Sequence, residues 1–215
     1  MQSPAFGTTW ANIEDLSLQW TMDGSCELSR EDFDREAVQT AEFTIGLVQY
    51  TTRLKRLDLD FDLSSQGEII MQRLSNLDLC QLQELTLGHL YIEPGTLLSL
   101  LQVIRNTLRV VSLSFITMVD GGWDRVLKGL GNELPLLQSI KLQFLRQRPG
   151  PCSLVHFPRL SESLVVDENS KFTTIQLKKG PNHLGGSGVF NTTIEYSGRS
   201  MNLAIEILRE CLALR

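Results

Sequence analysis

The sequence has no excess of positive charge and no long apolar run. Its 215 residues include 20 Lys and Arg against 25 Asp and Glu, for a net charge of −5. Nucleic-acid binding depends on neutralising phosphates with cationic side chains, so this balance argues against broad affinity for DNA or RNA. No stretch approaches the roughly 18 consecutive apolar residues of a membrane-spanning helix. We therefore expect a partner that is neither a nucleic acid nor a membrane.

A secretory signal is also missing from the first residues. Residues 1–16 show neither a basic region nor an apolar region of the kind that directs export. The expected location is the cytoplasm or the nucleus, where thiols stay reduced. The four cysteines contain no CxxC pair, so zinc-type spacing is absent and free thiols are expected. These cysteines are Cys26, Cys80, Cys152 and Cys211.

Motifs for catalysis or cofactor binding are lacking as well. The glycine-rich run 185–188 is not followed by the Lys-Ser/Thr of a phosphate-binding loop, and no GxSxG is present. His89, His156 and His183 fall in separate segments without a metal-ligand partner four residues on, and we interpret them as surface or turn residues. The sequence therefore predicts no enzyme activity, catalytic residue, cofactor or metal site.

A repeated leucine pattern is what the sequence does contain. Four stretches place aliphatic residues at relative positions 1, 4 and 6, the spacing of a leucine-rich repeat. They are LKRLDL, LQELTL, LRVVSL and LQSIKL, and they begin at residues 54, 82, 108 and 137, which gives steps of 28, 26 and 29 residues. Weaker copies begin at Ile13 and Phe172, at larger offsets that require inserted loops. Residues two apart in each stretch point to the same side of a strand.

Helix signals alternate with these strands. Amphipathic patterns, a Pro at a first turn and a Pro after a last turn predict helices over 29–50, 68–77, 94–107 and 123–134, with a closing helix over 200–214. Residues 146–153 read as an exposed basic loop, 157–166 as a strand or a short helix, and 180–200 as a Gly-, Asn- and Ser-rich stretch.

The alternation predicts an α/β fold. We expect a right-handed leucine-rich-repeat solenoid, or horseshoe, with a parallel sheet on the concave face and helices on the convex face. One domain would cover residues 1–215 in about five or six repeats, with 1–50 as the first repeat and cap and 146–215 as an irregular final repeat and cap. Leu57, Leu85, Val111 and Ile140 should then lie on adjacent parallel strands.

The concave face is the expected binding surface. Its side chains would begin acidic, become small and neutral, and end basic, which suits a protein ligand of matching polarity. The paired acids Asp58 and Asp60 are interpreted as a solvated charged face and not as a catalytic dyad. The simpler alternative, that these residues only keep the sheet soluble, stays open. The candidate partner-binding residues are Asp15, Arg56, Asp58, Asp60, Glu84, Thr86, Ser112, Ser114, Lys141, Gln143, Gln176 and Lys178.

These stretches resemble a known family. LKRLDLDF, LQELTLGHLYI, the run from Thr107 to Leu142 and the closing YSGRSMNLAIEIL are similar to the leucine-rich C-terminal region of fungal F-box-type proteins. The resemblance implies a substrate-recognition region of a ubiquitin-ligase receptor, with an SCF adaptor as a second partner where an F-box lies upstream. No F-box is visible before the first strand-like stretch. The alternatives are a secreted fungal effector, another leucine-rich-repeat scaffold, or an α/β hydrolase or nucleotide-binding domain with its site at the strand C-termini.

Overall fold

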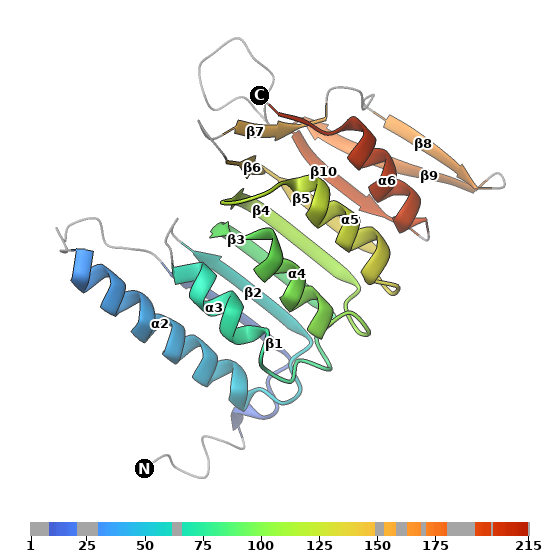
Figure 1. The fold of residues 1–215 in the computed structure, drawn as a ribbon. Helices are drawn as coiled ribbons and strands as arrows, with labels where there is room; N and C mark the ends of the chain where they lie inside the picture. Colours follow the sequence, from blue (N-terminus) through green and yellow to red (C-terminus); the bar gives the residue numbers. More distant parts are fainter. Residues whose placement is uncertain are drawn as a thin grey trace.

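The computed structural model shows an α/β fold built on a mostly parallel sheet (Figure 1). It describes residues 9–20, 30–61, 66–148, 153–157, 163–168, 171–179, 192–198 and 200–214. Five strands lie side by side in chain order and run parallel. They are β1 (Asp15–Trp20), β2 (Arg56–Phe61), β3 (Glu84–Ile92), β4 (Val110–Met118) and β5 (Ser139–Gln143).

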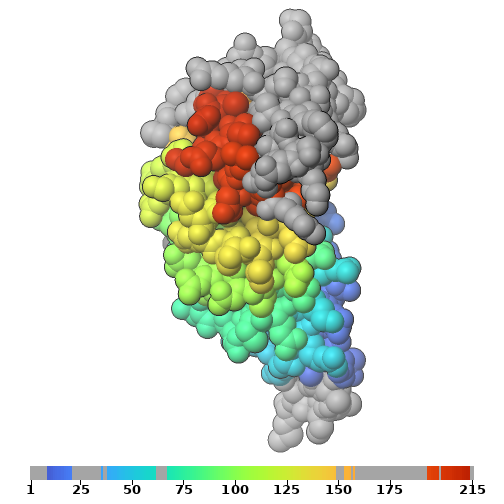
Figure 2. All heavy atoms as spheres, turned by 90° about the vertical axis from the view of Figure 1, so that its right-hand side faces the viewer, coloured from blue at the N-terminus to red at the C-terminus, as the bar shows by residue number. Residues whose placement is uncertain are grey.

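Helices connect the parallel strands and cover one face of the sheet (Figure 1). Each helix packs against the next one along the chain. They are α2 (Arg30–Tyr50), α3 (Gln66–Leu74), α4 (Pro94–Val103), α5 (Trp123–Glu133) and, after the last long strand, α6 (Met201–Cys211). All five predicted helices are confirmed, and three of them end three or four residues earlier than expected. In the space-filling view, successive strand–helix units form bands in chain order (Figure 2).

The register of the parallel strands confirms the predicted leucine alignment. Leu57 pairs with Leu85, Leu85 with Val111, and Val111 with Ile140. All four side chains are at most 1% exposed. Because side chains alternate across a strand, this row fixes which residues face the helices and which face away.

The same hydrogen-bond pattern recurs where each parallel strand begins. A single carbonyl in one unit accepts two backbone N–H groups from the next unit: Glu14 from residues 55 and 56, Lys55 from 83 and 84, Gln83 from 109 and 110, and Arg109 from 138 and 139. The donor–acceptor distances are 2.7 to 3.0 Å. Successive units therefore enter the sheet with the same backbone geometry.

The last part of the sheet differs from the predicted repeat. After β5, the neighbouring strand is β10 (Thr192–Ser197), which runs antiparallel, followed by the antiparallel strands β9 (Lys171–Lys179) and β8 (Ser163–Glu168). The predicted sixth parallel repeat at 172–177 is therefore wrong. A parallel neighbour needs a crossover, usually a helix, and the described part of residues 144–170 contains strands but no helix.

Short strands complete this end of the molecule. Residues 146 and 147, predicted as loop, form β6 (Arg146–Gln147) and pair with β4, while β7 (Ser153–His156) pairs with β6 and with β11 (Ala213–Leu214). Within the predicted basic loop, Ser153 begins β7 and residues 149–152 lie outside the described residues. Within 157–166 the structure describes the start of β8, in agreement with the strand alternative. Among the described helices, none combines the length and the hydropathy that crossing a bilayer requires.

Leu85→Asp should unfold the chain by placing a charge in this buried row. Leu85 is 0% exposed, so the carboxylate would have no solvent, and we expect a loss of more than about 4 kcal/mol in the free energy of unfolding. Leu136→Asp is the matched control, because Leu136 is 42% exposed. Urea denaturation followed by circular dichroism measures both. Equal stability of the two variants would contradict the shared core.

Candidate functional site

The sheet face away from the helices carries the predicted binding residues in straight rows across the strands. One row joins Asp15, Arg56, Glu84, Val110 and Ser139; the next joins Ser17, Asp58, Thr86, Ser112 and Lys141; the third joins Gln19, Asp60, Gly88, Ser114 and Gln143. We call this surface the open face. The structure therefore brings together ten of the twelve candidates on β1 to β5.

Gln176 and Lys178 lie on β9, two strands beyond β5. Backbone register pairs Gln176 with Glu195, which pairs with Lys141, and it pairs Lys178 with Thr193, which pairs with Gln143. Their backbone positions thus extend the second and third rows, although through antiparallel strands. Their side chains lie outside the described part of the structure.

Most basic side chains of the open face are already paired. The Arg56 Nε lies 3.4 Å from Asp15 Oδ1 and 3.3 Å from Glu84 Oε1, which links three neighbouring strands. The Lys141 Nζ lies 3.4 Å from Glu195 Oε1. All these side chains are between 31% and 64% exposed, so each ion pair contributes little to stability. The pairs mainly cancel local charge.

Asp58 and Asp60, which we call the acidic pair, differ in this respect. Both are half-buried, and neither forms an ion pair with a Lys or Arg of the described residues. Asp58 Oδ2 accepts a hydrogen bond of 3.3 Å from the Ser17 hydroxyl. Asp60 Oδ1 lies 2.6 Å from Nδ1 of His89. Because a carboxylate can only accept, the Nδ1 hydrogen of His89 donates in this bond.

Three stacked rings continue from Asp60 across the open face. The His89 and Phe115 rings have centroids 4.4 Å apart with planes at 9°, and the Phe115 and Phe144 rings are 4.4 Å apart at 16°. We call His89, Phe115 and Phe144 the aromatic ladder. Its rings are half-exposed and come from equivalent places at or just after β3, β4 and β5.

A repeated backbone kink produces the ladder. His89, Phe115 and Phe144 have φ values of 51°, 56° and 50°, and they are the non-glycine residues of positive φ in the described part of the chain. Before the kink Gly88 pairs with Ser114, and after it Leu90 pairs with Ile116, so the strands keep their register. The kink turns each ring out where strict alternation would bury it, in the way a bulge re-aims a side chain.

Positive φ is costly for such residues. A bulky side chain in this region costs about 1 to 3 kcal/mol, and the two ring stacks contribute only about 0.5 to 1.5 kcal/mol each. Stacking alone therefore does not offset three strained residues. The aliphatic residues that follow the kinks, Leu90, Ile116 and Leu145, are at most 3% exposed. Their burial holds the kinked strands in place.

The sequence interpretation missed the ladder. His89 was assigned to an ordinary surface or turn position, and the two phenylalanines were not counted among the outward residues. The available signal was the recurrence of an aromatic residue followed by an aliphatic one in GHL, SFI and QFL at 88–90, 114–116 and 143–145. Period-two alternation points these rings inward, so only the backbone dihedral angles reveal their true direction.

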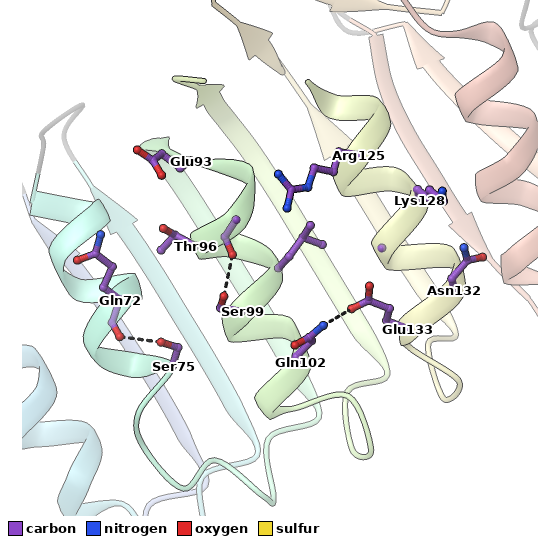
Figure 3. Close-up of a pocket in the computed structure, with 13 residues that line it drawn as sticks. Gln72, Ser75, Glu93, Thr96, Ser99, Gln102, Arg125, Lys128, Asn132 and Glu133 are labelled. Atoms are coloured by element: carbon purple, nitrogen blue, oxygen red, sulfur yellow. Dashed lines mark hydrogen bonds between the residues drawn. The ribbon is translucent and has the colours of Figure 1, made fainter. Parts of the chain in front are cut away.

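The helical face carries a groove of a different kind (Figure 3). It has a volume of about 670 Å³ and lies between α3, α4 and α5. Arg125 and Lys128 oppose the acids Glu93 and Glu133 in its lining, and Glu133 accepts a 2.9 Å hydrogen bond from Gln102. Charges of both signs are thus mixed in an open polar groove. One end of the groove, at Glu93, adjoins the C-terminal end of β3, and the groove extends from there along the helices to Gln102 and Glu133.

The two described thiols lie in the turn before β3 and at the end of α6. Cys80 and Cys211 are free, and Cys26 and Cys152 lie outside the described residues. A hydrogen bond with Asp78 and the charge of that carboxylate raise the pKa of the Cys80 thiol, so it stays protonated and weakly nucleophilic. Within the described ranges, no group of three or more His, Cys, Asp or Glu could hold a metal ion.

Comparison of the chain with known proteins found no match. No protein-family model matches it, and neither a curated protein nor a solved structure gives a match. The open face must therefore be interpreted from its own geometry.

Gly88→Ala should separate Asp60 from His89. A Cβ at Gly88 would lie 2.5 Å from Asp60 Oδ1, so the carboxylate must move, and we expect a loss of about 1 to 2 kcal/mol in the free energy of unfolding. In an Asp60→Ala background the same change should be neutral or stabilising by about 0.4 to 1 kcal/mol. A double-mutant cycle by urea denaturation measures the coupling. Equal losses in both backgrounds would refute this contact.

At Phe115, a Gly replacement should be more stable than an Ala replacement, which is the reverse of the usual order of stability in a strand. Gly relieves the positive φ while Ala retains it, so Phe115→Gly should be more stable than Phe115→Ala by about 0.5 to 1 kcal/mol. At Ser112, on the same strand and face but without positive φ, Ala should be the more stable replacement. Denaturation midpoints of the four variants test the kink, and the same order at both positions would argue against it.

Proposed function

We propose that the chain is a non-catalytic protein–protein interaction module that binds a protein partner through its open face. The observation that supports this most strongly is the aromatic ladder, three strained and half-exposed rings on rigid strands. Strain of this kind concentrates at functional sites, and aromatic side chains are enriched in protein–protein interfaces. A surface serving only solubility has no need for either feature.

The finer fold proposed for this module is a leucine-rich-repeat solenoid with the open face concave. Support comes from the repeat spacing of 26 to 29 residues, the identical strand-entry hydrogen bonds and the aligned buried aliphatic row. The antiparallel strands β10, β9 and β8 would then form an irregular C-terminal cap within the same domain.

The specific version of this function is substrate recruitment for a ubiquitin ligase. Its support is the resemblance of the repeats to the C-terminal region of fungal F-box-type proteins, and it adds an SCF adaptor as a partner if an F-box lies upstream. The module would act in the cytoplasm or nucleus. A secreted effector built on the same repeats is the alternative, and the two free thiols, Cys80 and Cys211, do not supply the disulfides that would favour it.

Affinity purification from the source cell, followed by mass spectrometry and rebinding of the purified partner, tests the general function. Ubiquitin-ligase subunits among the rebinding partners would support the specific version. A partner that rebinds without them would leave a general binding scaffold.

Reversing the acidic pair should weaken that rebinding without unfolding the chain. Asp58→Lys combined with Asp60→Lys adds cations to an open and partly solvated surface, so we expect at least a tenfold loss of affinity for the partner. Glu206→Lys combined with Glu210→Lys makes the same charge change on exposed positions of α6. Titration by calorimetry compares the two double variants. Equal affinity of both would remove the acidic side of the open face from the proposal.

A further inference from the structure

The acidic pair and the aromatic ladder adjoin one another, and together they indicate what kind of segment fits. We propose that the partner segment carries a Lys or Arg next to an apolar side chain, with the cation at Asp58 and Asp60 and the apolar group on the ladder. This inference rests on the protein-binding function proposed above and specifies its ligand class. Three observations on the open face support it.

The first observation is that neither carboxylate of the acidic pair has a Lys or Arg partner among the described residues. Asp58 and Asp60 stand two residues apart on β2 and therefore point to the same side. The nearest cation on their strand, Arg56, is held between Asp15 and Glu84 in the adjacent row. A guanidinium or ammonium group from a partner would supply the missing charge and form charge-assisted hydrogen bonds with the carboxylates.

The second observation is how the rings are presented. Phe115 has one face against His89 and the other against Phe144, so its two ring faces are occupied. A cation binds aromatic rings over the face, and both faces of Phe115, the central ring, are taken by its neighbours, whereas the ring edges offer rigid apolar surface. The cation is therefore assigned to the carboxylates, and an aliphatic or aromatic side chain is assigned to the ladder.

The third observation sets the spacing. The 2.6 Å contact between Asp60 and His89 joins the acidic pair directly to the first ring, and the ladder then continues in two steps of 4.4 Å. An extended chain advances about 3.3 to 3.6 Å per residue, so about two or three residues span the ladder. The basic and apolar residues of the partner should lie within about four positions of each other.

The groove between α3, α4 and α5 gives no comparable assignment. Arg125 and Lys128 share its lining with Glu93 and Glu133, so neither an anionic nor a cationic ligand is favoured by charge. Two of its hydroxyls are already used: Thr96 donates to Glu68 at 2.5 Å and Ser99 donates to the Gly95 carbonyl at 2.9 Å. The open face, in contrast, has charged and aromatic residues that point to one class of ligand.

A phage-displayed library of random dodecapeptides, selected on the full chain, tests this proposal. We expect enriched peptides with Lys or Arg within four positions of an apolar residue. The affinity of synthetic copies, measured by fluorescence anisotropy, should fall at least tenfold with Asp58→Asn and with Phe115→Gly. Phe43→Ser, at a 62% exposed position of α2, should leave the affinity unchanged.

The decisive comparison pairs a peptide change with a protein change. Replacing the basic peptide residue by Gln should weaken binding to the parent chain but have little further effect on Asp58→Asn. Ser112→Arg, which places a long side chain in the centre of the open face, should abolish binding. Circular dichroism of each variant confirms folding.

The outcomes separate the two proposals. Peptides that lose binding to Ser112→Arg but are insensitive to Asp58→Asn and Phe115→Gly would overturn the assigned ligand class, while the open face would remain a binding surface. Peptides that all bind Ser112→Arg as well as the parent chain would contradict the assigned ligand class and the proposed function together.

Discussion

The contact between equivalent aliphatic side chains on neighbouring strands is the constraint on which this structure depends. A single βα unit exposes the apolar side of its strand and the facing stripe of its helix, and neither can be buried within the unit. Stacking Leu57, Leu85, Val111 and Ile140 in one row removes that surface from water. Strand order, parallel direction and the placement of every helix on one face follow from the need to continue this row.

Repetition of the backbone extends the constraint to the open face. Each unit enters the sheet through the same pair of N–H groups on one carbonyl, and the kink recurs at equivalent positions of three of these units, at His89, Phe115 and Phe144, but not at Phe61 of β2. Gly88–Ser114 and Leu90–Ile116 pairing is preserved across it. A kink in one strand alone would leave backbone groups unpaired, which is costly inside a sheet. The spacing of the ladder rings is thus close to that of neighbouring strands, because they occupy equivalent positions of stacked units.

The sequence predicted the parts of the fold that depend on spacing. The LxxLxL stretches gave β2 to β5 and the buried row, and the amphipathic stripes gave all five helices, because both patterns express burial directly. The prediction was wrong at 172–177, where the spacing of a leucine-rich repeat occurs in a strand that pairs with an antiparallel neighbour. It also missed β10, whose alternating Ile194 and Tyr196 lie in a stretch judged only by its Gly and Asn content. For the site, side-chain alternation along the strands predicts the rows of the open face. It cannot predict the direction of His89, Phe115 and Phe144, because a positive φ sets that direction and the order of polar and apolar residues carries no information about φ.

The same rigidity explains why such a face suits recognition of another chain. Ordering flexible side chains on binding costs about 0.5 to 1.5 kcal/mol each, and that cost is reduced where the side chains are already fixed. Each ladder ring is held by its neighbour, and the His89 ring is held further by Asp60. Arg56 is likewise held between two carboxylates, so it does not compete for the acidic pair. The fold therefore holds the aromatic ladder and the acidic pair in fixed relative positions. Those fixed positions, more than the area of the open face, would allow it to select among protein segments.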